Sequence, residues 1–323
     1  MISRYEKYSY DCLVRLILFI WLLYSLYLNQ KRKLSLIKLS ENGIIEWSNT
    51  VRSILFFLPV GMMLVSQVSF SQESYLHYHN KESIKILTIG NSFADNACKY
   101  LEQITESVEG YSIDITKANI GGASLGKHTN LIDKCKEDQN LKPYSGKYCL
   151  KELLSKNIYD YVTIQQVSTL SFKYESFQPY ADSLVTFVKR YSPKSEIIVH
   201  QTWAYSPDSD RLKKWNMSRE DMHTKLTINY QDLAGRYETF ILASGKTFDK
   251  SFKRYPNINL WKDDSHHAND NGCYLAGCVW FGELFGVSPK KIKFYPESMD
   301  RKTSRRLKRI AFRAIKSLKK NDH

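Results

Sequence analysis

The fold of this chain is most constrained by residues 83–104, SIKILTIGNSFADNACKYLEQI. Residues 84–89 form a short apolar run rich in β-branched side chains, typical of a buried strand, and the apolar spacing of a helix follows. Gly90 provides the turn, which places Ser92 at the carboxyl end of a strand and the amino end of a helix. Free backbone amides at such a point can stabilise an anion, which suits a nucleophilic serine. Asn91 and Ser92 are also good helix N-caps, so plain capping is the alternative from this stretch alone.

Strand-like and helix-like segments alternate along the rest of the chain. The expected strands are residues 84–89, 111–117, 159–165, 195–201 and 239–243. The expected helices are residues 94–108, 124–139, 147–156, 178–191, 219–236, 272–285 and 301–319. This alternation predicts a parallel sheet covered by helices on both faces, with the functional edge formed by the loops that follow the strands.

The N-terminal part has the pattern of targeting sequence. Residues 54–65, ILFFLPVGMMLV, have the length of a signal-peptide core, and small residues follow at Ser69 and Ser71, so we expect residues 51–71 to be a signal peptide. After a linker at residues 72–83, residues 84–320 would form one domain of ordinary α/β size.

Residues 1–50 allow two interpretations. The apolar run at residues 10–28 is long enough for a membrane helix that would tether the protein, although Arg15 and several tyrosines weaken this reading. Alternatively, the start codon is mis-assigned and residues 1–50 are irrelevant. Both interpretations predict an exported domain in the bacterial periplasm, on the cell surface or outside the cell.

The formal net charge of +14 is concentrated at the C-terminal end. Residues 301–320 contain ten basic residues and no acid, yet apolar residues recur among them at helical spacing. This pattern predicts an amphipathic helix docked on the domain with a solvated basic face, in preference to a nucleic-acid or anionic-membrane surface. No nucleic-acid motif accompanies it, so we expect no nucleic-acid partner.

The chain has six cysteines, and none has the paired spacing of a zinc site. Cys135 and Cys149 bracket a polar loop, so a local disulfide there is an expectation for an oxidising compartment. Cys273 and Cys278 lie in a predicted helix and are expected to be core residues.

A base for Ser92 could come from the loop DDSHH at residues 263–267. An aspartate three residues before a histidine can hold the imidazole Nδ1 proton and leave Nε2 free to accept the serine proton. Either Asp263 with His266 or Asp264 with His267 has this spacing. A metal-binding or merely polar loop is the alternative, and metal is the weaker one because no second ligand cluster is present.

An acyl-transfer site also needs hydrogen-bond donors for an oxyanion. The stretch NIGGASL at residues 119–125 supplies a Gly-Gly turn that can approach a ligand closely, and the Ser92 amide is a second donor. The side chain of Gln165 or Gln166, which follow the third predicted strand, could be a third.

These stretches resemble the SGNH hydrolases, also called GDSL-type esterases and lipases. Residues 90–93, GNSF, resemble the nucleophile block of that superfamily, with Asn91 in place of the usual aspartate. Residues 119–124 resemble the glycine block, and residues 264–267 match the closing Asp-x-x-His block. The continuation through Gly272 into a helix of small residues is also similar, and it favours Asp264 with His267 over the alternative pair.

The third block departs from the family pattern. The superfamily has Gly-x-Asn-Asp, whereas this chain has QQVS at residues 165–168, as a secreted bacterial subgroup of unassigned substrate does. A glutamine carboxamide can donate the same kind of hydrogen bond as asparagine. The resemblance therefore leaves open which of Gln165 and Gln166 donates to the oxyanion.

The resemblance implies a three-layer α/β/α sandwich with a central parallel sheet, flavodoxin-like, and a serine esterase. Ser92 would be the nucleophile, His267 the base and Asp264 its partner. The Ser92 and Gly122 amides would hold the oxyanion, with Gln165 as first choice of side-chain donor. The resemblance requires no metal and no organic cofactor.

For an exported member, the expected substrate is an O-acetyl group on a carbohydrate, or another small ester. Trp203, Tyr205 and Trp261 lie in or beside the functional loops and could stack on a sugar ring, or equally pack against the edge of the sheet. The alternative function is a catalytically silent carbohydrate-binding or surface scaffold protein on the same fold.

Overall fold

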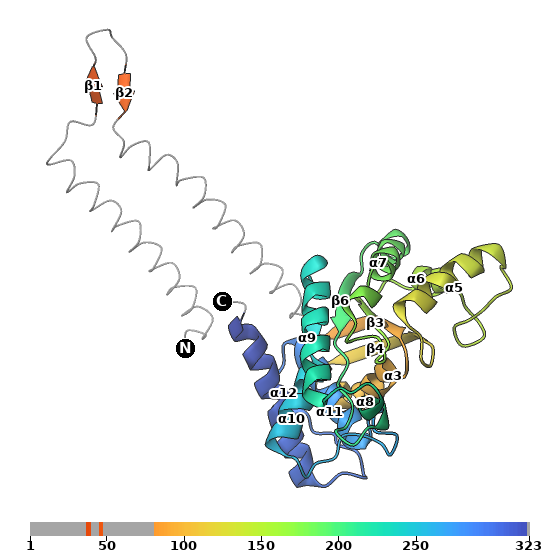
Figure 1. The fold of residues 1–323 in the computed structure, drawn as a ribbon, viewed down its shortest axis with the longest axis vertical. Coiled ribbons are helices and arrows are strands. Elements are labelled where there is room, and N and C mark those ends of the chain that lie inside the picture. The colour runs from red at the N-terminus through yellow and green to blue at the C-terminus, as the bar shows by residue number, and fades with distance from the viewer. Residues whose placement is uncertain (1–36, 40–44, 48–80, 322–323) are drawn as a thin grey trace. The chain divides into compact units, whose positions relative to one another are not determined.

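The computed structural model describes residues 37–39, 45–47 and 81–321, which belong to two units, Met1–Tyr75 and Leu76–His323 (Figure 1). In the first unit, β1 (Ile37–Leu39) pairs with β2 (Ile45–Trp47) in an antiparallel hairpin. The expected signal peptide and membrane helix lie outside the described residues. Within the described ranges, no helix combines the length and the apolar character needed to cross a membrane.

The second unit is built on five parallel strands. They are β3 (Ser83–Gly90), β4 (Ser112–Asn119), β5 (Tyr161–Ile164), β6 (Glu196–His200) and β7 (Ile241–Leu242). Their order in the sheet is β4-β3-β5-β6-β7, which is the 2-1-3-4-5 order of flavodoxin-like folds. Gly90 is paired with Asn119, and Ile89 with Ile164, so these strands end at one edge.

Both faces of the sheet are buried. In β3 the side chains of Ile84, Ile86, Leu87 and Ile89 have no exposed surface. Because neighbouring residues of a strand point to opposite faces, burial of Ile86 together with Leu87 requires cover on both sides.

Helices provide this cover in two layers. One layer contains α3 (Ser92–Cys98), α4 (Leu101–Glu106), α10 (Ser244–Arg254), α11 (Asp270–Phe285) and α12 (Arg301–Asn321). The other contains α5 (Leu125–Glu137), α6 (Leu150–Lys156), α7 (Tyr180–Tyr191) and α9 (Arg219–Arg236). The first group packs around α11, α7 contacts α5 and α6, and Figure 1 shows the strands between α5–α7 and α10–α12. The predicted three-layer α/β/α fold is confirmed.

The structure differs from the prediction in several local features. The helix expected at residues 94–108 is divided into α3 and α4, because the Lys99 amide bonds to the Asn96 carbonyl and tightens the turn there. Two helices, α8 (Asp210–Lys214) and α10, were not expected, because they contain few apolar residues. The expected disulfide is absent: Cys135 and Cys149 are free thiols that both point at the Leu141 carbonyl.

Candidate active site

The two polar residues of the turn after β3, Asn91 and Ser92, have different roles. Asn91 is the N-cap of α3, since its Oδ1 accepts a hydrogen bond from the Phe93 amide at 3.0 Å. Ser92 is the first residue of the helix, and its hydroxyl is left for other partners. Gly90 is needed for close approach, because a Cβ there would lie 2.9 Å from the side chain of Gln165.

The Ser92 hydroxyl is hydrogen-bonded to an imidazole from a distant part of the sequence, that of His267. Its Oγ lies 2.7 Å from Nε2 of His267, and Nδ1 of His267 lies 2.7 Å from Oδ2 of Asp264. With Nδ1 donating its proton to the carboxylate, Nε2 is the unprotonated nitrogen and accepts the hydrogen bond of the serine. The structure thus brings together Ser92, His267 and Asp264, the three residues expected from the sequence.

Asp264 is held as a carboxylate by its own loop. Burial alone would raise the pKa of its carboxyl, but hydrogen bonds from the His266 amide and from the side chain and amide of His267 lower that pKa well below its usual value. Burial lowers the pKa of His266, whose ring Nδ1 donates to the Asp264 carbonyl at 2.7 Å instead of reaching Ser92.

The histidine loop is fixed against the rest of the domain by three contacts. The Ala268 amide donates to Oδ1 of Asn96 in α3 at 3.0 Å, and Ala268 also forms a β-bridge with Trp261. Trp203 Nε1 donates to the His266 carbonyl at 3.0 Å. The bond to Asn96 connects the loop to the nucleophile helix, and the bond from Trp203 connects it to the segment after β6.

The position of Gln165 differs from its expected role as an oxyanion donor. Its side chain is 1% exposed, and Nε2 donates to Asn91 Oδ1 at 2.8 Å while Oε1 accepts from His200 Nδ1 at 2.8 Å. Asn91 Nδ2 in turn donates to the Ala123 carbonyl. Gln165 therefore supports the cap of the nucleophile helix, because its longer side chain reaches back under the turn.

The carboxamide of Gln166 is also hydrogen-bonded within the protein. Its Nε2 donates to the carbonyl and hydroxyl of Ser176, and its Oε1 accepts from the amides of Leu125 and Val167. It thus holds the start of α5 to the loop after β5. Neither glutamine carboxamide is presented to Ser92, which corrects the expectation of a third side-chain donor from this block.

Two backbone amides remain as candidate oxyanion donors. The Ser92 amide belongs to the first turn of α3, where N–H groups have no partner within the helix. Gly122 lies at an exposed point of the loop after β4 with φ of +66°, a left-handed conformation that favours glycine, and there is open space where a Cβ would be. Ser124 caps α5 through the Lys127 amide, which fixes the loop.

Two buried histidines support the nucleophile turn and were not predicted. His128 Nε2 donates to the Gly90 carbonyl at 2.9 Å, and its Nδ1 accepts from the hydroxyl of Tyr144. Burial lowers the pKa of His128 to about 4 and that of His200 to about 3, so both are neutral at ordinary pH. His200 is the last residue of the buried strand β6, and that position is the sequence signal for its burial.

The aromatic residues proposed for sugar stacking are not accessible. Trp203 has no exposed surface and stacks between Phe93 and Phe248, with both ring centroids 4.5 Å away. Tyr205 is equally buried, and its hydroxyl bonds to Ser168. Trp261 is 4% exposed. The packing alternative therefore describes these residues, and the stacking expectation for Trp203 and Tyr205 is corrected.

The same loop has the composition of a metal cluster. Asp264, His266 and His267 each offer a ligand atom, all within 4.8 Å of one another. In the described geometry, Oδ2 of Asp264 and both ring nitrogens of His267 are already hydrogen-bonded to each other or to Ser92. This donor set fits proton transfer more closely than coordination, because a metal would have to displace these bonds.

Comparison with known proteins places this site in a wider context. A family model described as a domain of unknown function, DUF4886, matches residues 85–314. A crystal structure of a DUF4886 family protein from Bacteroides uniformis is similar, with a TM-score of 0.65 and 25% identity over 72% of this chain and 95% of that one. No curated protein matches the chain.

More distant solved structures include hydrolases. A candidate SGNH hydrolase from Slackia heliotrinireducens has a TM-score of 0.47 and 17% identity over 62% of this chain and 99% of that one. Axe2, an acetylxylan esterase from Geobacillus stearothermophilus, has a TM-score of 0.45 and 14% identity over 64% of this chain and 95% of that one. The fold itself is shared with the DUF4886 family protein from Bacteroides uniformis.

Proposed function

Because the chain belongs to the DUF4886 family, described as a domain of unknown function, we propose its activity from its own site: a serine esterase that acts on small acyl esters of carbohydrates. The observation that carries the proposal is the unbroken series from the Ser92 hydroxyl through His267 to Asp264, with both joining distances at 2.7 Å. A cap residue needs no such partner, and here Asn91 is the cap.

The proposed reaction has two halves. In the first, Ser92 Oγ attacks the ester carbonyl while its proton passes to His267 Nε2, and the imidazolium then protonates the departing alcohol. In the second, His267 takes a proton from water, the resulting hydroxide attacks the acyl-serine, and the proton returns to Ser92 as the acid leaves. Asp264 stays ionised throughout and stabilises the imidazolium.

The oxyanion in this proposal is held by the Ser92 and Gly122 amides. Both come from the turns after neighbouring strands, β3 and β4, whose ends are paired as Gly90 with Asn119. Backbone donors fixed in this way need no reorganisation as negative charge develops on the carbonyl oxygen.

A groove beside the start of α5 supports a hydroxyl-rich substrate through the polar side chains on its walls. The groove has a volume of about 870 Å³, and Ser124 and Gln166 line it, whereas Ser92 and His267 do not. Its walls carry Asn130, Ser176 and the exposed ring of Tyr180 together with the apolar Leu131 and Leu170. An acetylated sugar outside the cytoplasm, where the N-terminal sequence would direct the protein, fits these features.

The test measures acetate release from acetylated sugars and from a chromogenic acetate ester by the full-length protein. Ser92→Ala and His267→Ala should each lower kcat by at least 1000-fold, because the nucleophile and its base act as a unit. His266→Ala is the matched control, since it removes the adjacent imidazole that does not contact Ser92, and it should retain most of the activity.

A fluorophosphonate probe provides a second readout that is independent of the substrate. It should label the wild type and the His266→Ala variant, but not Ser92→Ala. Folded wild-type protein that neither releases acetate nor accepts the probe would contradict the esterase and favour a silent binding protein on the same fold.

A further inference from the structure

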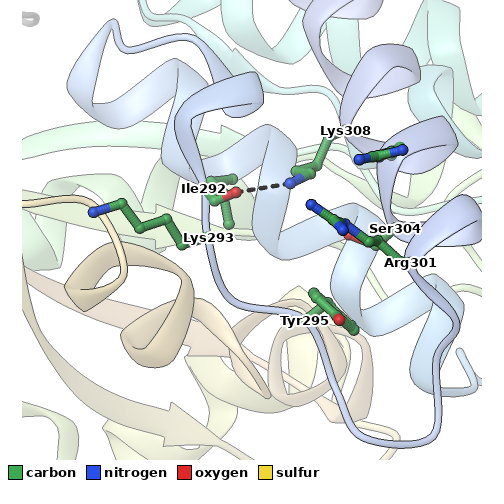
Figure 2. Close-up of a pocket in the computed structure, with 7 residues that line it drawn as sticks. Ile292, Lys293, Tyr295, Arg301, Ser304 and Lys308 are labelled. Atoms are coloured by element: carbon green, nitrogen blue, oxygen red, sulfur yellow. Dashed lines mark hydrogen bonds between the residues drawn. The ribbon is translucent and has the colours of Figure 1, made fainter.

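A second cavity lies at the beginning of α12. It has a volume of about 360 Å³ and shares no lining residue with the candidate active site. It is formed by the segment after the short 3-10 helix η2 (Pro289–Lys291) and by the first turns of α12 (Figure 2). Its lining residues are Ile292, Lys293, Tyr295, Arg301, Ser304, Arg305 and Lys308.

Three cationic side chains line the cavity at the N-terminal turns of α12, where a helix disfavours positive charge. Arg301, Arg305 and Lys308 follow one another at spacings of four and three residues, so they share one face of α12, and like charges at such spacings destabilise a helix. Arg301 also lies in the first turn, which contains no acid and where the helix dipole disfavours a cation. Arg301 and Arg305 are exposed, so water screens part of this repulsion, and an anion bound between them would offset the rest.

In the described part of the chain, no acidic side chain forms an ion pair with Arg301, Arg305 or Lys308. None of the residues that line the cavity is acidic. The nearest acid in sequence, Asp300, is occupied as a cap and accepts from the amides of Lys302 and Thr303 and from the Thr303 hydroxyl. Arg301 and Arg305 have no ion pair among the described residues.

Lys308 is fixed in place without an acidic partner. Its Nζ donates to the Ile292 carbonyl at 2.7 Å, the hydrogen bond drawn in Figure 2. Burial, together with the positive charges of Arg305 and Arg301, lowers the pKa of Lys308. The ammonium group therefore keeps further N–H donors in a region where positive charge is in excess.

We propose that this cavity binds a phosphoryl group, held by the guanidinium groups of Arg301 and Arg305 and by the ammonium group of Lys308. The planar fork of arginine matches phosphate oxygens in a bidentate way, and three cations match a dianion better than a carboxylate. Ser304 contributes a hydroxyl, and the ring of Tyr295, 38% exposed, forms a wall for a small organic group attached to the phosphate. The volume suits a phosphate monoester or a lipid headgroup.

The test compares two double variants of the full-length protein. Arg301→Gln with Arg305→Gln removes two charges from the cavity. Arg309→Gln with Arg313→Gln removes two charges from exposed positions on the same helix that do not line the cavity. Glycerol 3-phosphate and inorganic phosphate are titrated by calorimetry at constant ionic strength, with acetate as the monoanion for comparison.

The cavity variant should bind glycerol 3-phosphate at least 30-fold more weakly than the wild type, because two charge-assisted hydrogen-bond donors are lost. The control variant should change the Kd less than about threefold, and acetate should not compete. Equal weakening in both double variants, or equal binding of acetate, would overturn the proposal and indicate a general charge effect.

Vesicles distinguish the source of the phosphoryl group. Binding to phosphatidylglycerol vesicles that is lost only in the cavity variant, without binding of soluble phosphates, would assign the site to a lipid headgroup. Loss restricted to soluble phosphates would assign it to a free phosphoester, and no selective loss in either experiment would refute the site. Unfolding temperatures and acetate release should be alike in both variants, so the result does not depend on the proposed esterase activity.

Discussion

The corrected role of Gln165 leads to a prediction that separates support of the nucleophile turn from oxyanion binding. In Gln165→Leu, His200 Nδ1 loses its acceptor and becomes a buried donor without a partner, which costs about 1–3 kcal/mol. Asn91 Oδ1 loses one of two donors and keeps the Phe93 amide, which costs about 0.5–1.5 kcal/mol. We therefore expect the free energy of unfolding to fall by about 2–4 kcal/mol, or roughly 4–16 °C in Tm.

The catalytic effect should be small by comparison. Asn91 retains its bonds to Phe93 and to the Ala123 carbonyl, so Ser92 stays in position, and kcat measured well below Tm should fall less than about tenfold. An oxyanion donor behaves in the opposite way, because its removal lowers kcat by about 100-fold to 1000-fold with little effect on stability. Chemical denaturation and acetate release on the same samples measure both quantities.

A second substitution completes this experiment. Adding His200→Phe removes the unpaired donor, and a phenyl ring can keep the edge-on contact with Trp280, whose centroid lies 4.8 Å away. Replacing both polar partners by apolar groups is nearly neutral, so the double variant should regain about 1–2 kcal/mol relative to Gln165→Leu. A Gln165→Leu protein as stable as the wild type but 100-fold slower would refute this reasoning.

Three further predictions concern stability and chemistry. The hydrogen bond from Lys99 lowers the pKa of Asp270 to about 2, below the usual value of about 3.9. This carboxylate therefore stabilises the fold above about pH 4 and loses its contribution as the pH falls towards 2. Asp270→Asn should flatten that part of a curve of unfolding free energy against pH. Trp203→Ala should lower the free energy of unfolding by about 3–5 kcal/mol, because it empties the space between Phe93 and Phe248. Unchanged stability together with weaker sugar binding would instead indicate that Trp203 stacks on a sugar ring. Incubation with EDTA followed by the acetate assay should leave the rate unchanged, whereas loss that zinc restores would identify the Asp264 loop as a metal site.

The elements near the nucleophile could be predicted because their signals are local. The run of apolar β-branched residues before Gly90 defines β3, and Asp264 and His267 are placed close together by a three-residue spacing that needs no knowledge of the rest of the fold. The order of the blocks along the chain then gave the pairing with Ser92. The same kind of evidence predicted the parallel sheet, since strands and helices alternate throughout.

The features that sequence reasoning missed depend on distant partners. Gln165 lies 74 residues from Asn91 and 35 from His200, so no local pattern shows that its carboxamide is used inside the protein. In α10, Thr247 and Asp249 are buried, which makes a packed helix look polar in sequence. Asp249 is paired with Arg219 of α9 at 3.0 Å, a compensation that only the folded chain reveals.

The two groups at the centre of the site are 175 residues apart in sequence, although their atoms are 2.7 Å apart. During synthesis the ribosome adds Ser92 long before His267. The loop that carries His267 leads directly into α11, around which α3, α4, α10 and α12 pack. A chain that ends before His267 cannot contain the hydrogen-bonded pair. In the proposed esterase, Ser92 therefore becomes reactive only when the loop that carries His267 is present and packed, and a chain clipped before that loop has the nucleophile without the base that would activate it.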